Sequence, residues 1–204
     1  MSHYFDKRPD VGSDRATVTL AVDDRVLTLA TDRGVFSRGQ IDAGTAVLLR
    51  KGPAAPTGRL LDLGCGYGPL ALALAAQSPD AEVWAVDVNE RALELVAENA
   101  AANELTNITV AAADAVPDEL TFDAIYSNPP VRIGKEALHD LLRSWLGRLT
   151  SSGAAYLVVQ RHLGADSLHA WLEREDYPTS RLASSKGYRV LEVHRLRAGT
   201  AEGR

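Results

Sequence analysis

Three consecutive residues, Asn128, Pro129 and Pro130, are the ones best suited to chemistry in this chain of 204 residues. They follow the apolar run at 122–127, which reads as a strand. Neither proline can extend a helix or donate to a sheet, because neither has a backbone N–H. The turn therefore presents an amide and bare carbonyls that can hold an –NH2 group while it attacks an electrophile. The alternative is an ordinary turn, since Asn-Pro is also a common turn starter.

A glycine-rich turn at 64–68 follows the apolar run at 60–63 and precedes an apolar stretch at 70–76. A strand, a glycine turn and a helix are typical of nucleotide sites, because glycine lets the backbone approach a ligand closely. The spacing is Gly-x-Gly-x-Gly, not the Gly-x-Gly-x-x-Gly of dinucleotide sites. The alternative is a plain strand–turn–helix.

Asp87 ends the next expected strand, 82–86. An acidic residue about 20 positions beyond such glycines can accept hydrogen bonds from both ribose hydroxyls. The alternative for Asp87 is a helix cap, although Asn89 is better placed to cap the helix that follows.

Strands and helices alternate along the chain, which predicts an α/β fold with a parallel sheet covered on both faces. The strands are expected at 60–63, 82–86, 108–112, 122–127 and 154–159, with a hairpin at each end of the chain, 16–20 with 25–29 and 180–184 with 189–194. The helices are expected at 42–51, from the glycine turn to 77, and at 90–103, 135–149 and 167–174, the last capped by Asp166. Ligands of such sheets bind at the carboxyl ends of the strands, so the motifs that end the first four core strands converge on one crevice.

The order of these motifs resembles that of class I S-adenosylmethionine-dependent methyltransferases. The matching residues are Asp62, Gly64, Gly66, Gly68, Asp87, Asp114 after the third core strand, and Asn128-Pro129-Pro130 after the fourth. Asn-Pro-Pro resembles the subset that methylates exocyclic or amide nitrogens. The segments at 3–9, 34–37 and 42–45 extend the likeness, from about residue 3 to about residue 195, to the methyltransferase small-domain family, which includes guanine-N2 methyltransferases of small-subunit ribosomal RNA.

The resemblance implies a doubly wound, mostly parallel seven-stranded sheet with a C-terminal antiparallel hairpin and a small N-terminal extension of a β-hairpin and a helix. We expect the extension at 1–53, the methyltransferase core at 54–196 and a disordered tail at 197–204. The implied cofactor is S-adenosylmethionine, with the glycines on its methionine side, Asp87 on the ribose and Asp114 on the adenine amine. The cofactor-binding residues implied are Asp62, Gly64, Cys65, Gly66, Gly68, Asp87, Val88, Asp114, Ala115 and Asn128.

The catalytic residues expected are Asn128, Pro129 and Pro130. The methyl group of a sulfonium is already activated, so the protein has to supply placement. Asn128 Oδ1 and the Pro129 carbonyl would accept the two N–H groups of the amine, orient its lone pair and stabilise the developing positive charge. No dedicated base is needed. On this view Asn128→Asp keeps the acceptor and should retain part of the activity.

Related enzymes often carry an aromatic residue after the prolines, where it stacks on a flipped base. Here Val131 and Arg132 occupy that stretch, which leaves Phe36, Tyr67 or the Arg132 guanidinium to hold the base. The net charge of −5 argues against indiscriminate coating of nucleic acid. Cations in the segments near the expected site could still bind phosphates, and the alternative is that they are scattered surface charges. These cations are Lys7, Arg8, Arg33, Arg38, Arg132 and Lys135. Of these and the aromatics, Phe36, Arg38, Arg132 and Lys135 are the expected substrate contacts.

Composition fits an ordinary globular protein, with 46% hydrophobic and 24% charged residues. Cys65 is the only cysteine, so no internal disulfide forms, and the five histidines have no metal-ligand spacing. No apolar run is long enough for a membrane span, and the N-terminus lacks a signal-peptide pattern. We expect a cytoplasmic monomer without a metal or a membrane partner.

Three functions remain open from the sequence. The first is methylation of guanine N2 in small-subunit ribosomal RNA, with the RNA or the small subunit as partner. The second is methylation of a protein glutamine, whose amide presents the same two N–H groups to Asn-Pro-Pro. The third is a nucleotide-binding module without turnover, which would not need to keep both Asn128-Pro129-Pro130 and Asp87. The basic segments and the N-terminal resemblance favour RNA.

Overall fold

The computed structural model describes Lys7 and residues 10–196. The predicted disordered tail at 197–204 and the motif at 3–9, apart from Lys7, lie outside the described residues. The strands are β1 (Ala16–Val22), β2 (Arg25–Thr31), β3 (Arg59–Leu63), β4 (Glu82–Asp87), β5 (Ile108–Ala112), β6 (Phe122–Ser127), β7 (Leu149–Gln160), β8 (Thr179–Ser185) and β9 (Tyr188–His194). The α-helices are α1 (Ala43–Lys51), α2 (Pro69–Gln77), α3 (Glu90–Ala102), α4 (Lys135–Leu146) and α5 (Ala165–Arg174).

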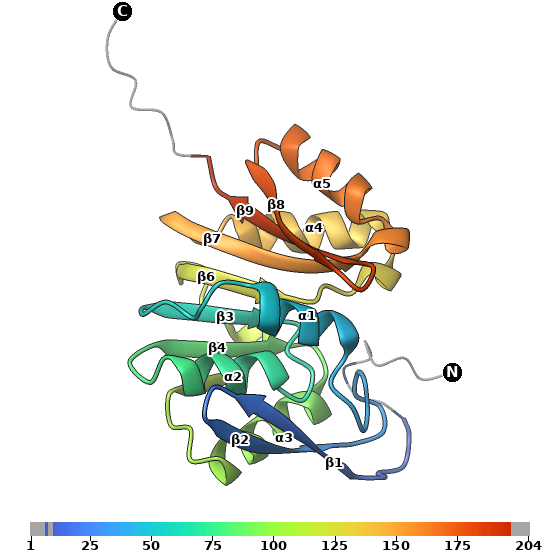
Figure 1. Ribbon diagram of the computed structural model, residues 1–204, viewed down its shortest axis with the longest axis vertical. Helices are drawn as coiled ribbons and strands as arrows, with labels where there is room; N and C mark the ends of the chain where they lie inside the picture. The colour runs from blue at the N-terminus through green and yellow to red at the C-terminus, as the bar shows by residue number, and fades with distance from the viewer. Residues whose placement is uncertain (1–6, 8–9, 197–204) are drawn as a thin grey trace, which may run out of the picture.

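Seven strands form the central sheet in the order β5-β4-β3-β6-β7-β9-β8 (Figure 1). β3 to β7 are parallel to one another, and β9 pairs antiparallel with both β7 and β8. β1 and β2 form a separate antiparallel hairpin. The predicted fold class is therefore confirmed, including the C-terminal antiparallel hairpin and the small N-terminal hairpin.

Two apolar layers sandwich the sheet, because successive residues of a strand point to opposite faces. In β3, Leu60 packs in the layer of α1, α2 and α3, whereas Leu61 and Leu63 pack in the layer of α4 and α5. In Figure 1, α1 and α2 lie in front of the sheet and α4 lies behind it. Asp62 falls on the same face as Leu60, so its carboxyl group is directed to the start of α2, where it accepts from the Ala71 N–H.

Two asparagines of the α3 segment bind the free edge of the N-terminal hairpin. The Asn99 side chain accepts from Ala30 N at 2.7 Å and donates to Ala30 O at 2.9 Å. Asn103 makes the same pair of contacts with Thr28, at 3.0 and 2.9 Å. These bonds satisfy backbone groups that an edge strand would otherwise expose. The domain limits at 1–53, 54–196 and 197–204 stay a prediction.

Several expected boundaries differ from the structure, most of them by one or two residues. The largest difference is at β7, which begins at Leu149 rather than at 154. α4 ends at Leu146, not at 149, because the chain turns at Gly147 and Leu149 already pairs with Phe122 in the sheet. The predicted cap Asp166 lies inside the first turn of α5, whose N-cap is Gly164 with a φ of 102°. The Asp166 carboxylate instead accepts from Arg189 at 2.9 Å.

Candidate active site

A pocket of about 340 Å³ opens at the carboxyl ends of β3, β4 and β6. Its wall combines apolar side chains from the strand ends with a few polar groups, as in most small-ligand sites. Nine of the residues predicted from the sequence line it, namely Phe36, Gly64, Gly66, Asp87, Val88, Asn128, Pro129, Pro130 and Arg132. Asp62 and Cys65 line a smaller adjoining cavity together with Gly64 and Gly66. The pocket lining does not include Gly68, Asp114, Ala115, Arg38 or Lys135.

The glycine turn is fastened to β4 through its backbone. The N–H groups of Gly64 and Cys65 both donate to Val86 O, at 2.8 and 3.0 Å. Gly64 and Gly66 have φ values of 76° and 55°, a region that L residues rarely adopt, and a Cβ on either would meet no atom within 4 Å. The turn therefore needs glycine for its conformation, and it leaves open space above both residues for a ligand.

Gly68 is needed for packing rather than for contact with a ligand. A Cβ at this position would lie 2.5 Å from Leu72 Cδ1 and 3.1 Å from Val96 Cγ2. Its φ of 94° also places it in the left-handed region at the N-cap of α2. The three glycines thus serve two purposes, since the first two face the pocket and the third lets α2 and α3 come together.

Asp62 is a buried carboxyl group with one unused oxygen. Its Oδ2 accepts from Ala71 N at 2.9 Å. Within the described part of the chain, Oδ1 is buried and has no hydrogen-bond partner. Burial raises the pKa of Asp62 to about 8, an effect that the Ala71 hydrogen bond opposes and the nearby charge of Asp87 reinforces. A buried acceptor without a hydrogen-bond partner lowers the stability of the folded protein. The ammonium group of a ligand beside Gly64 could donate to Asp62 Oδ1.

Asp87 connects the glycine turn to the start of α3. Its Oδ2 accepts from Gly66 N at 2.9 Å, and its Oδ1 accepts from Asn89 N at 2.9 Å. Burial raises its pKa, against the lowering effect of these backbone bonds. A carboxylate has about four acceptor sites, so Asp87 could also accept from the hydroxyls of a ribose. Asn89 caps α3 by accepting from Ala92 N at 3.2 Å, as predicted.

Asn128 is held in one orientation by two residues from the start of α1. Its Nδ2 donates to Asp42 Oδ2 at 2.7 Å and to Thr45 Oγ1 at 3.2 Å. Because a carboxylate can only accept, the amide atom that faces Asp42 must be the nitrogen. Asn128 Oδ1 has no partner among residues 10–196, and it is the oxygen that an –NH2 group in the pocket could reach.

The Pro129 carbonyl oxygen already accepts one hydrogen bond within the protein. It accepts from Val131 N at 2.8 Å, and Pro130 O accepts from Ile133 N at 3.1 Å. A carbonyl oxygen has two lone pairs, so Pro129 O retains one for a substrate N–H. The two bonds tighten the turn after β6 into the 3₁₀ helix Val131–Ile133.

The three residues considered for stacking on a base differ in position. Phe36 is 37% exposed and lines the pocket, as does Arg132. Tyr67 is buried in the core, and its hydroxyl donates to Gln40 O at 2.7 Å. Tyr188, which the sequence did not single out, also lines the pocket at the start of β9. A Cβ on Gly44 would lie 2.9 Å from its ring, so the tyrosine packs on the first turn of α1.

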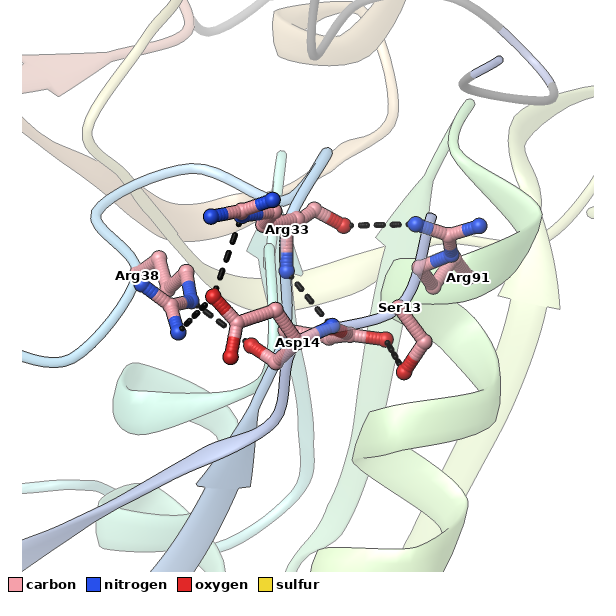
Figure 2. Close-up of polar contacts among 6 residues, drawn as sticks. Ser13, Asp14, Arg33, Arg38 and Arg91 are labelled. Atoms are coloured by element: carbon pink, nitrogen blue, oxygen red, sulfur yellow. Dashed lines mark hydrogen bonds and ion pairs between the residues drawn. The ribbon is translucent and has the colours of Figure 1, made fainter. Parts of the chain in front are cut away.

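A second polar network anchors the loop that carries Phe36 (Figure 2). Asp14 forms ion pairs with Arg33 at 3.1 Å and with Arg38 at 2.6 Å. Arg91 on α3 donates to Arg33 O at 2.7 Å. Arg33 and Arg38 therefore help to hold the loop, and part of their charge is compensated.

The other predicted contacts lie outside the pocket lining. The Asp114 side chain is 74% exposed and pairs with Lys7 at 3.6 Å. Ala115 is exposed, although its neighbour Ala113 lines the pocket. Lys135 is exposed at the first position of α4.

The polar or aromatic groups of the site that the sequence did not single out include Asp42, Thr45 and Tyr188. The segment at 42–45 resembles a family motif, but the resemblance assigns no role to Asp42 or Thr45. Asp42 looks like a simple helix cap, and it is one, since it accepts from Gly44 N and Thr45 N. Only the fold places it beside Asn128, 86 positions away.

The described residues offer neither a metal site nor a membrane span. No cluster of three or more His, Cys, Asp or Glu side chains able to hold a metal ion occurs among them. None of their helices is long and apolar enough to cross a membrane.

Two relatives are similar to this chain in sequence over most of its length. The chain is 34% identical over 198 residues to the uncharacterized protein YbxB of Bacillus subtilis, covering 95% of this chain and 98% of that one. It is 35% identical over 193 residues to the ribosomal RNA small subunit methyltransferase C of Pseudomonas aeruginosa, covering 92% of this chain and 57% of that one. The chain therefore spans little more than half the length of this second relative.

A solved structure shares the fold. It is the 16S rRNA N2 methyltransferase RsmC of T. thermophilus in complex with AdoMet and guanosine, with a TM-score of 0.75 and 27% identity. The match covers 92% of this chain and 52% of that one. The family model of the methyltransferase small domain matches residues 26–192, and this chain belongs to that family.

Proposed function

We propose that this chain transfers the methyl group of S-adenosylmethionine to the exocyclic N2 amine of a guanine in small-subunit ribosomal RNA. Asn128 carries the proposal, because its nitrogen is fixed by Asp42 and its oxygen is left for an –NH2 group. The names of the ribosomal RNA relatives support the same substrate. The substrate and partner, the RNA or the small subunit, belong to this proposal, as does a site of action in the cytoplasm.

The residues of the pocket and of the smaller adjoining cavity fit the cofactor. Asp62 Oδ1, buried and without a partner in the described chain, suits the ammonium of the methionine part. Asp87 suits the ribose hydroxyls, and the open space above Gly64 and Gly66 leaves room for the ligand. Val88, which is 47% exposed on the pocket wall, offers an apolar surface to the adenine. When bound, S-adenosylmethionine supplies a sulfonium methyl that passes to the amine nitrogen, with S-adenosylhomocysteine and one proton as the other products.

The chain contributes placement and charge stabilisation. Asn128 Oδ1 and the free lone pair of Pro129 O accept the two N–H groups of the amine, which directs the nitrogen lone pair towards the methyl group. The same two acceptors stabilise the positive charge that develops on nitrogen. The apolar wall of Leu63, Val86 and Val159 excludes water and strengthens both interactions. The proton leaves to solvent from the methylated product.

The test is incubation with labelled S-adenosylmethionine and, separately, small ribosomal subunits, naked small-subunit RNA or a protein extract. Digestion to nucleosides and amino acids then locates the label. We expect label in N2-methylguanosine from subunits or RNA. Label in methylglutamine would support the alternative substrate, and label in neither would contradict an N-methyltransferase of this kind.

A further inference from the structure

The two carboxylate oxygens of Asp42 differ in their hydrogen bonds. Oδ2 accepts from Gly44 N at 2.7 Å, from Thr45 N at 3.1 Å and from Asn128 Nδ2 at 2.7 Å. In the part of the chain that the structure describes, Oδ1 accepts no hydrogen bond and no cation pairs with Asp42. The orientation of this carboxylate is therefore set by three donors to one oxygen, which leaves the second oxygen available.

The second oxygen belongs to the same wall as the acceptors already assigned to the amine. Asp42, Asn128 and Pro129 line one pocket, and Asn128 is in direct contact with Asp42. In a base whose amine is bound to Asn128 Oδ1, the ring atom on the Asp42 side of the amine would face this carboxylate. What that ring atom carries decides whether the contact is favourable.

The nucleobases differ at this atom. In guanine the ring nitrogen N1, next to the exocyclic amine, carries a hydrogen and is a donor. In adenine and cytosine the ring nitrogens beside the amine are acceptors. A carboxylate oxygen attracts an N–H group and repels a lone pair, and such a contact in a partly buried site discriminates strongly.

We propose that Asp42 is a specificity-determining residue, whose free oxygen accepts the ring N–H beside the methylated amine and so selects guanine over adenine and cytosine. This inference rests on the proposed function. It assigns two roles to one side chain, since Oδ2 positions Asn128 and Oδ1 contacts the base. It also disfavours a glutamine side chain, whose amide carries no second N–H beside its –NH2 group.

The test uses RNA with guanine or 2-aminopurine at the position methylated in the preceding experiment. 2-Aminopurine keeps the 2-amine but has no hydrogen on N1. The Asp42→Asn variant keeps an acceptor oxygen for the α1 cap and for Asn128, and replaces the free oxygen with a donor. For each RNA, kcat/KM is measured for wild type and variant, with the KM for S-adenosylmethionine as a second readout.

We expect wild type to prefer guanine, and Asp42→Asn to reduce the ratio of kcat/KM for guanine to that for 2-aminopurine by about 10- to 100-fold. The KM for S-adenosylmethionine should stay within about twofold, because Asp42 has no place in the cofactor contacts. Asp118→Asn is the matched control, since it removes the same charge from a side chain that is 100% exposed, and its ratio should equal that of wild type.

Asp42→Ser covers the case in which Asp42→Asn does not fold, because serine also caps helices but offers no second oxygen. It should lose the preference for guanine as well. If wild type forms N2-methylguanosine but both folded variants keep the wild-type ratio, Asp42 does not read the base and the proposed function stands. If wild type forms no N2-methylguanosine, the proposed function fails and this inference fails with it.

Discussion

The two walls of the pocket are built in different ways. The wall assigned to the cofactor comes from two adjacent strands, where Asp87 at the end of β4 accepts from Gly66 N after β3. The wall assigned to the amine comes from three distant segments, represented by Asp42, Asn128 and Tyr188. In the first wall, backbone N–H groups of the glycine turn donate to Val86 O and Asp87. In the second wall, Asn128 is oriented by a bond between side chains, in which its Nδ2 donates to Asp42 Oδ2.

This difference predicts unequal sensitivity to substitution. On the cofactor wall the glycine turn stays attached to Val86 O through its own backbone when a side chain is removed. On the amine wall, removing the Asp42 carboxylate leaves the Asn128 amide with only its longer bond to Thr45 Oγ1. We therefore expect substitutions on the amine wall to act on turnover, and substitutions on the cofactor wall to act on affinity.

The largest effect should follow removal of the Asn128 amide. Asn128→Ala eliminates an acceptor aimed at the developing charge, which typically lowers the rate by about 10²–10³. Pro129 and Pro130 still fix the backbone, so the affinity for S-adenosylmethionine should fall only modestly. The measurement is single-turnover methylation of RNA, with calorimetry for cofactor binding. A variant that still methylates at near the wild-type rate would show that Asn-Pro-Pro is only a turn.

Asn128→Asp sharpens this test, and the structure changes the expectation drawn from the sequence. The atom that faces Asp42 would become a carboxylate oxygen 2.7 Å from another carboxylate oxygen. Like charges in such contact repel, so the side chain should rotate or take up a proton. Instead of partial activity, we expect a loss at least as large as that of Asn128→Ala. If Asn128→Asp is much the more active variant, the bond to Asp42 does not position the amide.

On the other wall, Asp87→Ala should weaken binding of S-adenosylmethionine by about 10- to 100-fold, since hydrogen bonds to charged groups contribute roughly 1.5–3 kcal/mol each. The substitution also removes the partner of Gly66 N. At saturating cofactor, turnover should recover much of its wild-type value because the amine wall is intact. Calorimetry and saturation kinetics measure the two effects separately. Equal affinities in wild type and variant would remove Asp87 from the cofactor site.

The same contrast explains how far the sequence could predict the molecule. Strand exits and glycine turns are local patterns, so β3, β4, β6 and the convergence of their ends followed from periodicity and the rule for open sheets. The strand-end pattern treated Asp114 like Asp87, but β5 is the edge strand and Asp114 lies on a 3₁₀ turn beyond it, paired with Lys7. Its position relative to the pocket depends on tertiary structure, which no local pattern encodes.

The contacts that the sequence could not reveal join segments far apart in the chain. Asp42 satisfies every local criterion for a helix cap, which conceals its bond to Asn128. Tyr188 belongs to a terminal hairpin and reaches the pocket because β9 pairs with β7, placing Tyr188 beside Gln160. Arg38 reads as a free cation, yet Asp14 pairs with it. These partners could be found only after the fold had placed the segments together.

The smallest effect should come from two exposed cations, Arg132 in the pocket lining and Lys135 at the start of α4 outside that lining. Neither forms an ion pair with another described residue, so both charges remain available for phosphate. Replacing both with alanine should weaken RNA binding several-fold and reduce the slope of log K against log salt by up to about 1.4, at roughly 0.7 per phosphate contact on a single strand. Cofactor affinity should not change. Arg50 and Lys51 are the matched control, because they lie in the last turn of α1, whereas Asp42 at the other end of this helix lines the pocket. Their replacement removes the same charge, and it should leave the salt slope at the wild-type value. Identical slopes for both double variants would mean that Arg132 and Lys135 are ordinary surface charges, and that the amine wall contacts RNA through the base alone.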